Sequence, residues 1–195
     1  MIETLLVDFF DVLTAKGGYV YASEQLNILT GIPKQTIFDT LEAEDREYVI
    51  GKETTRGFWE RINKTIPVPF ERFAEIIGTY ELNKEVMDIL SRYKERVKLI
   101  LISDNYEMAS SVAENDTELN ALFDTMFFSN NVGLMKKNQT TDFYLHVLKE
   151  INCEASKAIF IDNNLSNVTT AATTGLKTIL YTSPHQLEKD LFTYF

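Results

Sequence analysis

Five short apolar runs, with helical spacing between the later ones, constrain the fold of this 195-residue chain more than any other feature. Each run has the length of a buried strand. They cover residues 4–8, 97–103, 123–128, 158–162 and 178–181. Strands and helices in alternation indicate a parallel sheet with helices on both faces. The sequence therefore predicts an α/β fold with a doubly wound, Rossmann-like, five-stranded parallel sheet.

Three of these runs end in a polar side chain, namely Asp8, Ser103 and Asp162. Ligands of such sheets bind outside the carboxyl ends of the strands. Because the carboxyl ends of parallel strands lie at one edge, these three side chains are expected to lie close together. We therefore predict a functional site at that edge, around Asp8.

The stretch between the first strand and the helix that begins near Asn83 is about seventy residues long, far more than one crossover needs. Its apolar spacing predicts four helices, over residues 21–29, 34–49, 54–64 and 69–80. We interpret residues 16–80 as a helical cap domain inserted into a core domain of residues 1–15 and 81–195. The charged run from Glu42 to Glu47 is interpreted as a solvated helix face.

Charge and composition exclude several partners. A formal net charge of −10 and a pI near 4.7 argue against nucleic acid or an anionic membrane surface, because both repel an acidic protein. No apolar run approaches the length of a bilayer crossing, and the first strand begins almost at Met1. We expect no signal peptide and a cytoplasmic location. An anionic substrate would need a local positive group to hold it.

Four segments carry a resemblance to a known family. They read LLVDFFDVLT from residue 5, KLILISDN from 98, SNNVGLMKKN from 129 and AIFIDNNLSNV from 158. In this order and at this spacing they resemble the four motifs of the haloacid dehalogenase-like (HAD) hydrolase superfamily, in the branch with a helical (type C1) cap. The resemblance covers essentially the whole chain.

The resemblance implies roles for individual residues. Asp8 matches the nucleophile, which forms a covalent ester with the substrate. Ser103 matches the hydroxyl that hydrogen-bonds the transferring group, and Lys136 matches the lysine that neutralises charge on the nucleophile and the bound anion. Lys136 would supply the positive group that an acidic chain needs. Lys137 stands where the family usually has proline and is expected to be solvated.

The resemblance also implies a cofactor, Mg²⁺, which prefers oxygen ligands. Its ligands would be Asp8, the backbone carbonyl of Phe10, Asp162 and Asn163. Asn163 is neutral where the family commonly has a second acidic residue, so metal binding should be weaker. We further expect Asp104, Asn105 and Asp11 to contribute to substrate binding.

Phe10 is the main departure from the family pattern. Phosphatases of the family usually carry a second aspartate there, which acts as general acid and then as general base. Loss of such help typically costs about 10²–10⁴-fold in rate. Asp11 follows where the family tends to have glycine. On an extended segment its side chain would point away from that of Phe10, so it is a poor replacement unless the chain turns.

Three functions remain open from the sequence. The leading one is a Mg²⁺-dependent phosphatase of a small phosphorylated metabolite, acting through an aspartyl-phosphate on Asp8. A metal-independent 2-haloacid dehalogenase is favoured by Phe10 and Asn164 but disfavoured by Asp162 and by the Ser103-Asp104 pair. A catalytically impaired binding or regulatory protein is the third. His146 is interpreted as a structural or surface histidine and Cys153 as a small residue at a helix end, because neither has a catalytic partner in a recognisable frame. His185 is expected in the loop after the last strand, near the edge of the site by topology only.

Overall fold

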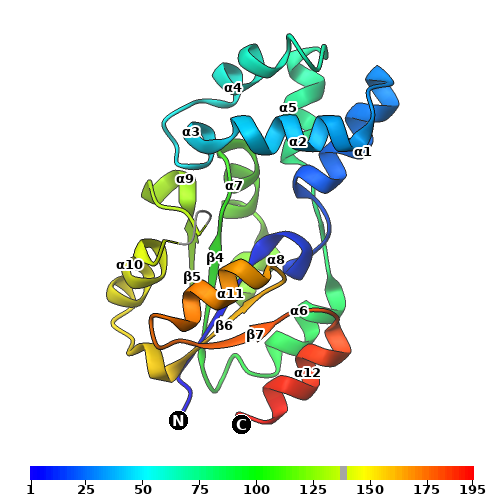
Figure 1. Cartoon of the computed structure of the whole chain (residues 1–195). Helices are drawn as coiled ribbons and strands as arrows, with labels where there is room; N and C mark the ends of the chain where they lie inside the picture. Colours follow the sequence, from blue (N-terminus) through cyan, green and yellow to red (C-terminus); the bar gives the residue numbers. More distant parts are fainter. Residues whose placement is uncertain (137–139) are drawn as a thin grey trace.

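The computed structural model describes residues 1–136 and 140–195. Its main sheet has five parallel strands in the order β5-β4-β1-β6-β7 (Figure 1). The strands are β1 (Thr4–Val7), β4 (Lys98–Ser103), β5 (Thr125–Phe128), β6 (Ala158–Asp162) and β7 (Lys177–Leu180). The predicted α/β fold with a five-stranded parallel sheet is confirmed, and β1 lies at its centre.

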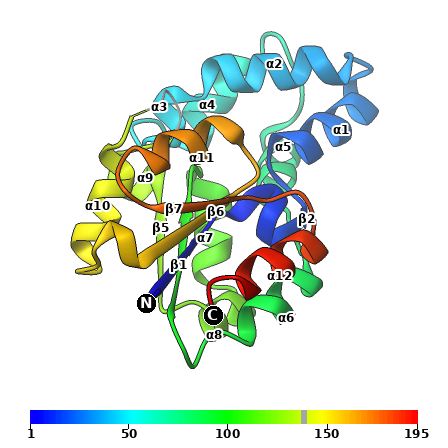
Figure 2. The ribbon, with the colours of Figure 1, turned by 60° about the horizontal axis from the view of Figure 1, so that its bottom comes forward.

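Alternate residues of the strands face opposite sides of the sheet, and helices cover both sides (Figure 2). Leu5 and Val7 face α6 (Lys84–Ser91), α8 (Thr117–Leu122) and α12 (Pro184–Phe192). Leu6 faces α10 (Asp142–Glu150) and α11 (Leu165–Ala172). Because the central strand is apolar on both sides, it is fully buried, and only its carboxyl end is left to present polar groups.

Five helices follow the first strand, and we call residues 18–78 the helical insert. They are α1 (Gly18–Thr30), α2 (Lys34–Glu44), α3 (Arg46–Val49), α4 (Thr55–Ile62) and α5 (Phe70–Gly78). Figure 1 shows the insert above the end of the sheet at which β1 terminates. The expectation of one helix over residues 34–49 is wrong. The helix breaks at Asp45, which lets the side chain of Tyr48 turn into the core of the insert.

A short antiparallel ribbon, which the sequence did not indicate, joins the two ends of the insert. It consists of β2 (Thr14–Lys16) and β3 (Glu81–Leu82), with an ion pair of 2.5 Å between Lys16 Nζ and Glu81 Oε2. These strands are too short to give a recognisable pattern. The predicted domain boundaries fall beside this ribbon, and the division into core and cap domains stays a prediction.

The insert is also tied to the core through α7 (Glu107–Glu114) and α9 (Ser129–Val132). The Ser129 hydroxyl donates to the Val49 carbonyl at 2.7 Å, and it accepts from the Asn105 amide at 2.8 Å. Glu107 Oε2 accepts from both the amide and the hydroxyl of Thr55, at 2.7 and 2.8 Å. These bonds fix the insert relative to the strand ends. None of the helices in the described ranges is long and apolar enough to cross a membrane.

Candidate active site

Asp8 is the first residue after β1, at the carboxyl end of the central strand. Its backbone amide continues the sheet by donating to the Ile161 carbonyl of β6 at 2.9 Å. That bond fixes the position of the Asp8 side chain, which is buried. The flanking residues of β1 are apolar on both faces, so Asp8 is the point at which the central strand first offers a charge.

Lys136 brings two of the predicted acidic residues together. Its Nζ donates to Asp8 Oδ1 at 2.5 Å and to Asp162 Oδ2 at 2.9 Å, and it lies 3.4 Å from the Ile102 carbonyl. All three side chains are buried. Two carboxylates therefore share one ammonium at the edge of the sheet, which leaves an excess of one negative charge when all three are ionised.

Asp162 is held by the chain that follows it. Its Oδ1 accepts from the Asn164 amide at 2.7 Å, and its Oδ2 accepts from Asn167 Nδ2 at 3.0 Å. The side chain of Asn164 caps α11 by accepting from the Ser166 amide at 2.9 Å. Asn167 is a residue of this cluster that the motifs did not single out. Its position in the first turn of the helix after Asp162 was the available signal.

The ionisation of this cluster follows from burial and from its charges. Burial and the neighbouring Asp162 raise the pKa of Asp8 above its ordinary value, against the lowering effect of Lys136. Burial alone would favour the neutral amine of Lys136. Asp162, Asp8 and Asp104 outweigh it and raise the pKa of Lys136, so the ammonium stays charged. An additional cation beside the carboxylates would relieve the repulsion between them.

The second predicted motif lies beside this cluster. Asp104 Oδ1 accepts from the Lys136 amide at 2.6 Å, so it orients the lysine from its backbone. The Ser103 hydroxyl is buried and lies 3.2 Å from the Asp104 carbonyl. Asn105 is also buried, and its Oδ1 accepts from the Tyr106 amide at 2.9 Å. Of these three residues, Asp104 lines the cavity described below.

The segment after Asp8 turns, which is the exception that the sequence left open for Asp11. Phe9–Leu13 forms an irregular helical turn, with Asp11 in the left-handed region at φ 61°. The hydroxyl of Thr14 accepts from the Asp11 amide at 3.1 Å and closes the turn. The ring of Phe10 packs on Phe9 and Tyr106, with centroid distances of 5.0 and 6.0 Å. As a result, Phe10 and Asp11 both line the same cavity.

The chemistry of the donor set fits a small divalent cation. Asp8, Asp162 and the Phe10 carbonyl offer only oxygen ligands, and Mg²⁺ is typically held by one or two carboxylates plus water and substrate oxygens. The excess negative charge around Lys136 favours a cation as well. Asn163 is exposed. This set has two carboxylates and one backbone carbonyl, and within residues 1–136 and 140–195 no metal-binding group of three or more His, Cys, Asp or Glu side chains is found.

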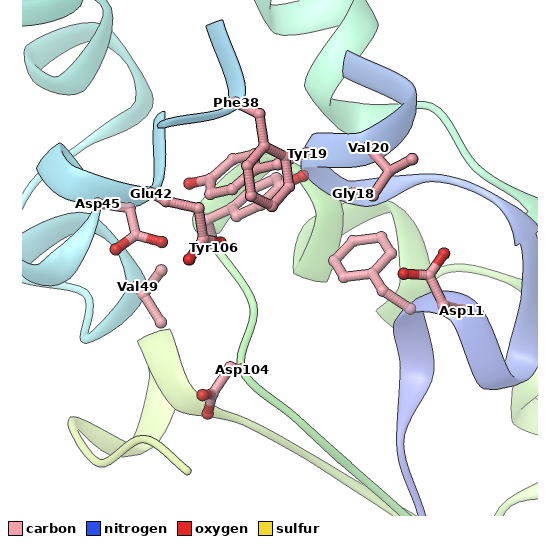
Figure 3. A pocket seen from close by; sticks show the side chains of 11 residues that line it. Asp11, Gly18, Tyr19, Val20, Phe38, Glu42, Asp45, Val49, Asp104 and Tyr106 are labelled. Atoms are coloured by element: carbon pink, nitrogen blue, oxygen red, sulfur yellow. The ribbon is translucent and has the colours of Figure 1, made fainter. Parts of the chain in front are cut away.

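A cavity of about 170 Å³ lies between the helical insert and the core (Figure 3). Asp45 lines it and is 3% exposed, so the interpretation of the whole Glu42–Glu47 run as a solvated face is wrong at this residue. The helix break at Asp45 is the physical reason.

His185 lies in the first turn of α12, not in a loop. Lys137 lies outside the described residues.

Comparison with known proteins agrees with this geometry. A family model described as haloacid dehalogenase-like hydrolase matches residues 2–181. The fold is similar to that of a HAD-family enzyme from Bacteroides thetaiotaomicron, solved with magnesium and inorganic phosphate (TM-score 0.78, 17% identity, 93% of this chain and 95% of that one). It is also similar to an L-2-haloacid dehalogenase from Xanthobacter autotrophicus with covalently bound chloropropionic acid (TM-score 0.70, 13% identity, 99% and 83%).

Two curated relatives come from Aspergillus. A drimenol cyclase from Aspergillus calidoustus is 24% identical over all of this chain, which spans 37% of that protein. A sesquiterpene phosphatase from Aspergillus oryzae is 42% identical over 55 residues, which are 28% of this chain and 27% of that protein. The chain thus spans well under half the length of these relatives. On the family match over residues 2–181, the chain belongs to the haloacid dehalogenase-like hydrolases.

Proposed function

We propose that this hydrolase is a Mg²⁺-dependent phosphatase of small phosphorylated metabolites, with Asp8 as its nucleophile. The observation that carries the proposal is the position of Lys136 Nζ, 2.5 Å from Asp8 Oδ1 and 2.9 Å from Asp162 Oδ2. An ammonium at this place both orients the attacking carboxylate and attracts an anionic group. The phosphatase name of one relative and the magnesium and phosphate bound by one fold neighbour support the same reaction.

The reaction would proceed in two displacements. Asp8 attacks the phosphorus, the bond from phosphorus to the leaving oxygen breaks, and an aspartyl-phosphate forms. The leaving oxygen keeps the bonding electron pair and takes a proton from water. A water molecule then attacks the phosphorus, and the bond from phosphorus to the Asp8 oxygen breaks with its electron pair left on the carboxylate. The proton that this water loses neutralises the hydroxide left by the first step, and inorganic phosphate is released. Lys136 stays charged throughout and stabilises the transferring group.

The remaining residues of the cluster assist by position. The Ser103 hydroxyl donates to an oxygen of the phosphoryl group, and Asp104 holds Lys136 through its backbone amide. Asp8, Asp162 and the Phe10 carbonyl would hold Mg²⁺, which would supply positive charge that offsets the negative charge of the phosphoryl oxygens. The helical insert acts as a cap over this site. The cap domain comprises residues 16–80, and the core domain comprises residues 1–15 and 81–195. The protein acts in the cytoplasm.

Phe10 sets the expected substrate dependence. Its side chain cannot protonate a leaving oxygen, so the rate should depend steeply on how stable the leaving anion is. Aryl phosphates should react faster than alkyl phosphates, because the general acid that would level this difference is worth about 10²–10⁴-fold. A shallow dependence would instead point to another proton donor at the site.

The test compares phosphate release from aryl and alkyl phosphomonoesters by the wild type and by Asp8→Asn, with Mg²⁺ and with EDTA. Asp39→Asn is a matched control, because Asp39 is an exposed carboxylate on α2 that pairs with Gln35. We expect Mg²⁺-dependent release by the wild type and the control, and none by Asp8→Asn.

A second arm of the test measures halide release from 2-chloropropionate in EDTA. Halide release without phosphatase activity would contradict the proposal and favour the dehalogenase reaction. That reaction needs no general acid, so it would be compatible with a phenylalanine at position 10. No release in either arm would favour the non-catalytic alternative. Equal phosphate release by Asp8→Asn and wild type would remove Asp8 from the mechanism.

A further inference from the structure

Phe10 is half-buried at the place where the helical insert joins the core. Its side chain packs against the large apolar cluster of the core and against that of the insert. Its ring centroid lies 5.0 Å from that of Phe9 and 6.0 Å from that of Tyr106. Among the described residues, no other partly buried hydrophobic side chain packs against both clusters. Phe10 therefore connects the two parts of the molecule.

The chain that enters the insert passes directly beside the Phe10 ring. Gly17 has φ +150° and Gly18 has φ +61°, and a Cβ on either residue would lie 3.1 Å from a carbon of that ring. A Cβ on Gly17 would also lie 3.1 Å from Tyr80 Cβ, where the chain leaves the insert. Two consecutive glycines permit a hinge. Here the Phe10 ring occupies the space beside both, so bending at these glycines would have to displace it.

The chain that leaves the insert is held at the same place. The Tyr80 ring meets the Phe9 ring edge-on, with a centroid distance of 5.0 Å. The Tyr80 hydroxyl donates to Asp116 Oδ2 at 2.8 Å, and Asp116 caps α8 of the core. Both ends of the insert are therefore fastened by aromatic contacts to the two residues that follow Asp8.

A helix of the core completes the apolar interior of the insert. Tyr106 and Ala109, at the start of α7, are buried in the same cluster as the apolar side chains of α4 and α5. The Tyr106 ring stacks on those of Tyr19 and Tyr48, each at a centroid distance of 5.3 Å (Figure 3). If the insert moved away from the core, these apolar side chains would be exposed to water, which is unfavourable.

We infer that the Phe10 ring holds the helical insert on the core, so that the two parts form one cooperative unit and the insert stays over Asp8 in the protein without substrate. Parts of a chain joined by linkers move relative to each other unless a large apolar interface joins them. Here that interface passes through Phe10. A residue that cannot act as a general acid thus has a conformational function at the same position.

The chain contains a probe of the insert. Trp59, its only tryptophan, lies in α4 and donates from Nε1 to the Val68 carbonyl at 2.8 Å. Its fluorescence during urea denaturation reports the insert, and hydrogen exchange of the β4 amides at the same urea concentrations reports the core. Both are measured in EDTA, so that no bound metal contributes. In the wild type we expect the two transitions to coincide, as they do for one cooperative unit.

Phe10→Ala should separate the two transitions, with the fluorescence of Trp59 changing at a lower urea concentration than the exchange of β4. The Thr55 amide, which donates across the junction to Glu107 Oε2 at 2.7 Å, should exchange about 10- to 100-fold faster in this variant. Phe38→Ala is the matched control, because Phe38 lines the same cavity but packs only against the cluster of the insert. It should shift both transitions together.

Two further variants complete the test. Phe10→Tyr keeps the ring and should behave as the wild type does. If Phe10→Ala does not fold, Phe10→Leu should give a smaller separation in the same direction. Two separate transitions in the wild type, or coincident transitions in the variants that lack the ring, would overturn the inference. No substrate is used, so the result does not depend on whether the protein hydrolyses a phosphomonoester.

Discussion

The cluster around Lys136 and the cavity around Tyr106 differ in how their polar groups are satisfied. In the cluster, Asp8 and Asp162 bond the lysine, and Asp162 also accepts from Asn164 and Asn167. In the cavity, the hydroxyls of Tyr19 and Tyr106 are buried without partners in the described structure. The charges of the cluster are therefore held by one another, whereas the wall of the cavity contains two buried hydroxyls that the described residues leave unbonded.

The largest effect should come from breaking the cluster. Lys136→Met leaves two buried carboxylates without their shared cation, and we expect a loss of about 3–5 kcal/mol in the free energy of unfolding. Urea denaturation measures it. Lys157→Met is the control, since Lys157 pairs with Glu3 and Glu154 at the exposed surface, and it should change stability little.

The loss in Lys136→Met should depend on pH. Burial and Asp162 raise the pKa of Asp8, so the folded chain binds that proton more tightly than the unfolded chain does. The stability associated with such a group is present at low pH and is lost as the pH rises through the folded pKa. Without Lys136 this pKa is higher still. Because the folded pKa of Asp8 is about 8 in the wild type, both folded chains hold this proton below that pH and differ only above it. The deficit of the variant should therefore shrink from about pH 9.5 to about pH 7, and a constant deficit over that range would contradict the charge-based explanation.

The next effect tests whether the cluster accepts a further cation. Mg²⁺ at one hundred times its dissociation constant should raise the free energy of unfolding by about 2.7 kcal/mol, if the unfolded chain does not bind it. EDTA should reverse the increase, and Asp162→Asn should abolish most of it. Thermal melts at several Mg²⁺ concentrations measure the change. An equal increase in Asp162→Asn would place the metal elsewhere.

The two regions also differ in how far sequence could predict them. The strand at residues 158–162 matches β6 residue for residue, because its apolar run is bounded sharply by Lys157 and by Asn163. The residues of the cluster follow strand ends or lie in motifs, so topology predicts their meeting. The cavity has no such marker. Tyr19 and Tyr106 look like ordinary core aromatics, and only the three-dimensional structure reveals that their hydroxyls lack partners.

Local turns were the other obstacle for prediction. Asp11 reaches the cavity because its backbone is left-handed, and the sequence offered no positive evidence for a turn there. Asp45 is buried because a helix breaks at it, within a run that otherwise has the composition of a solvated face. Both cases depend on one residue leaving the regular pattern. Periodicity, which averages over several residues, cannot detect this.

A smaller effect is expected at the contact between the helical insert and α9. Gly51 has φ +72°, and a Cβ there would lie 2.0 Å from the Asn130 carbonyl oxygen. Gly31 has φ +74°, and a Cβ there would meet no atom within 4 Å. Gly31→Ala therefore measures the cost of the backbone strain alone. Overpacking should make Gly51→Ala about 1–3 kcal/mol worse than Gly31→Ala by urea denaturation. Equal losses of unfolding free energy in the two variants would mean that α9 moves away from the new methyl group without a measurable loss of stability.

The smallest effect compares a satisfied tyrosine with an unsatisfied one. The Tyr48 hydroxyl lies 2.9 Å from the Thr55 hydroxyl and is buried, so Tyr48→Phe should lose about 1 kcal/mol of stability in the ligand-free protein. Tyr106→Phe removes a buried hydroxyl that has no partner, and it should gain about the same amount. If Tyr106→Phe is instead destabilised without ligand, its hydroxyl is already satisfied by water, and the cavity is as preorganised as the cluster.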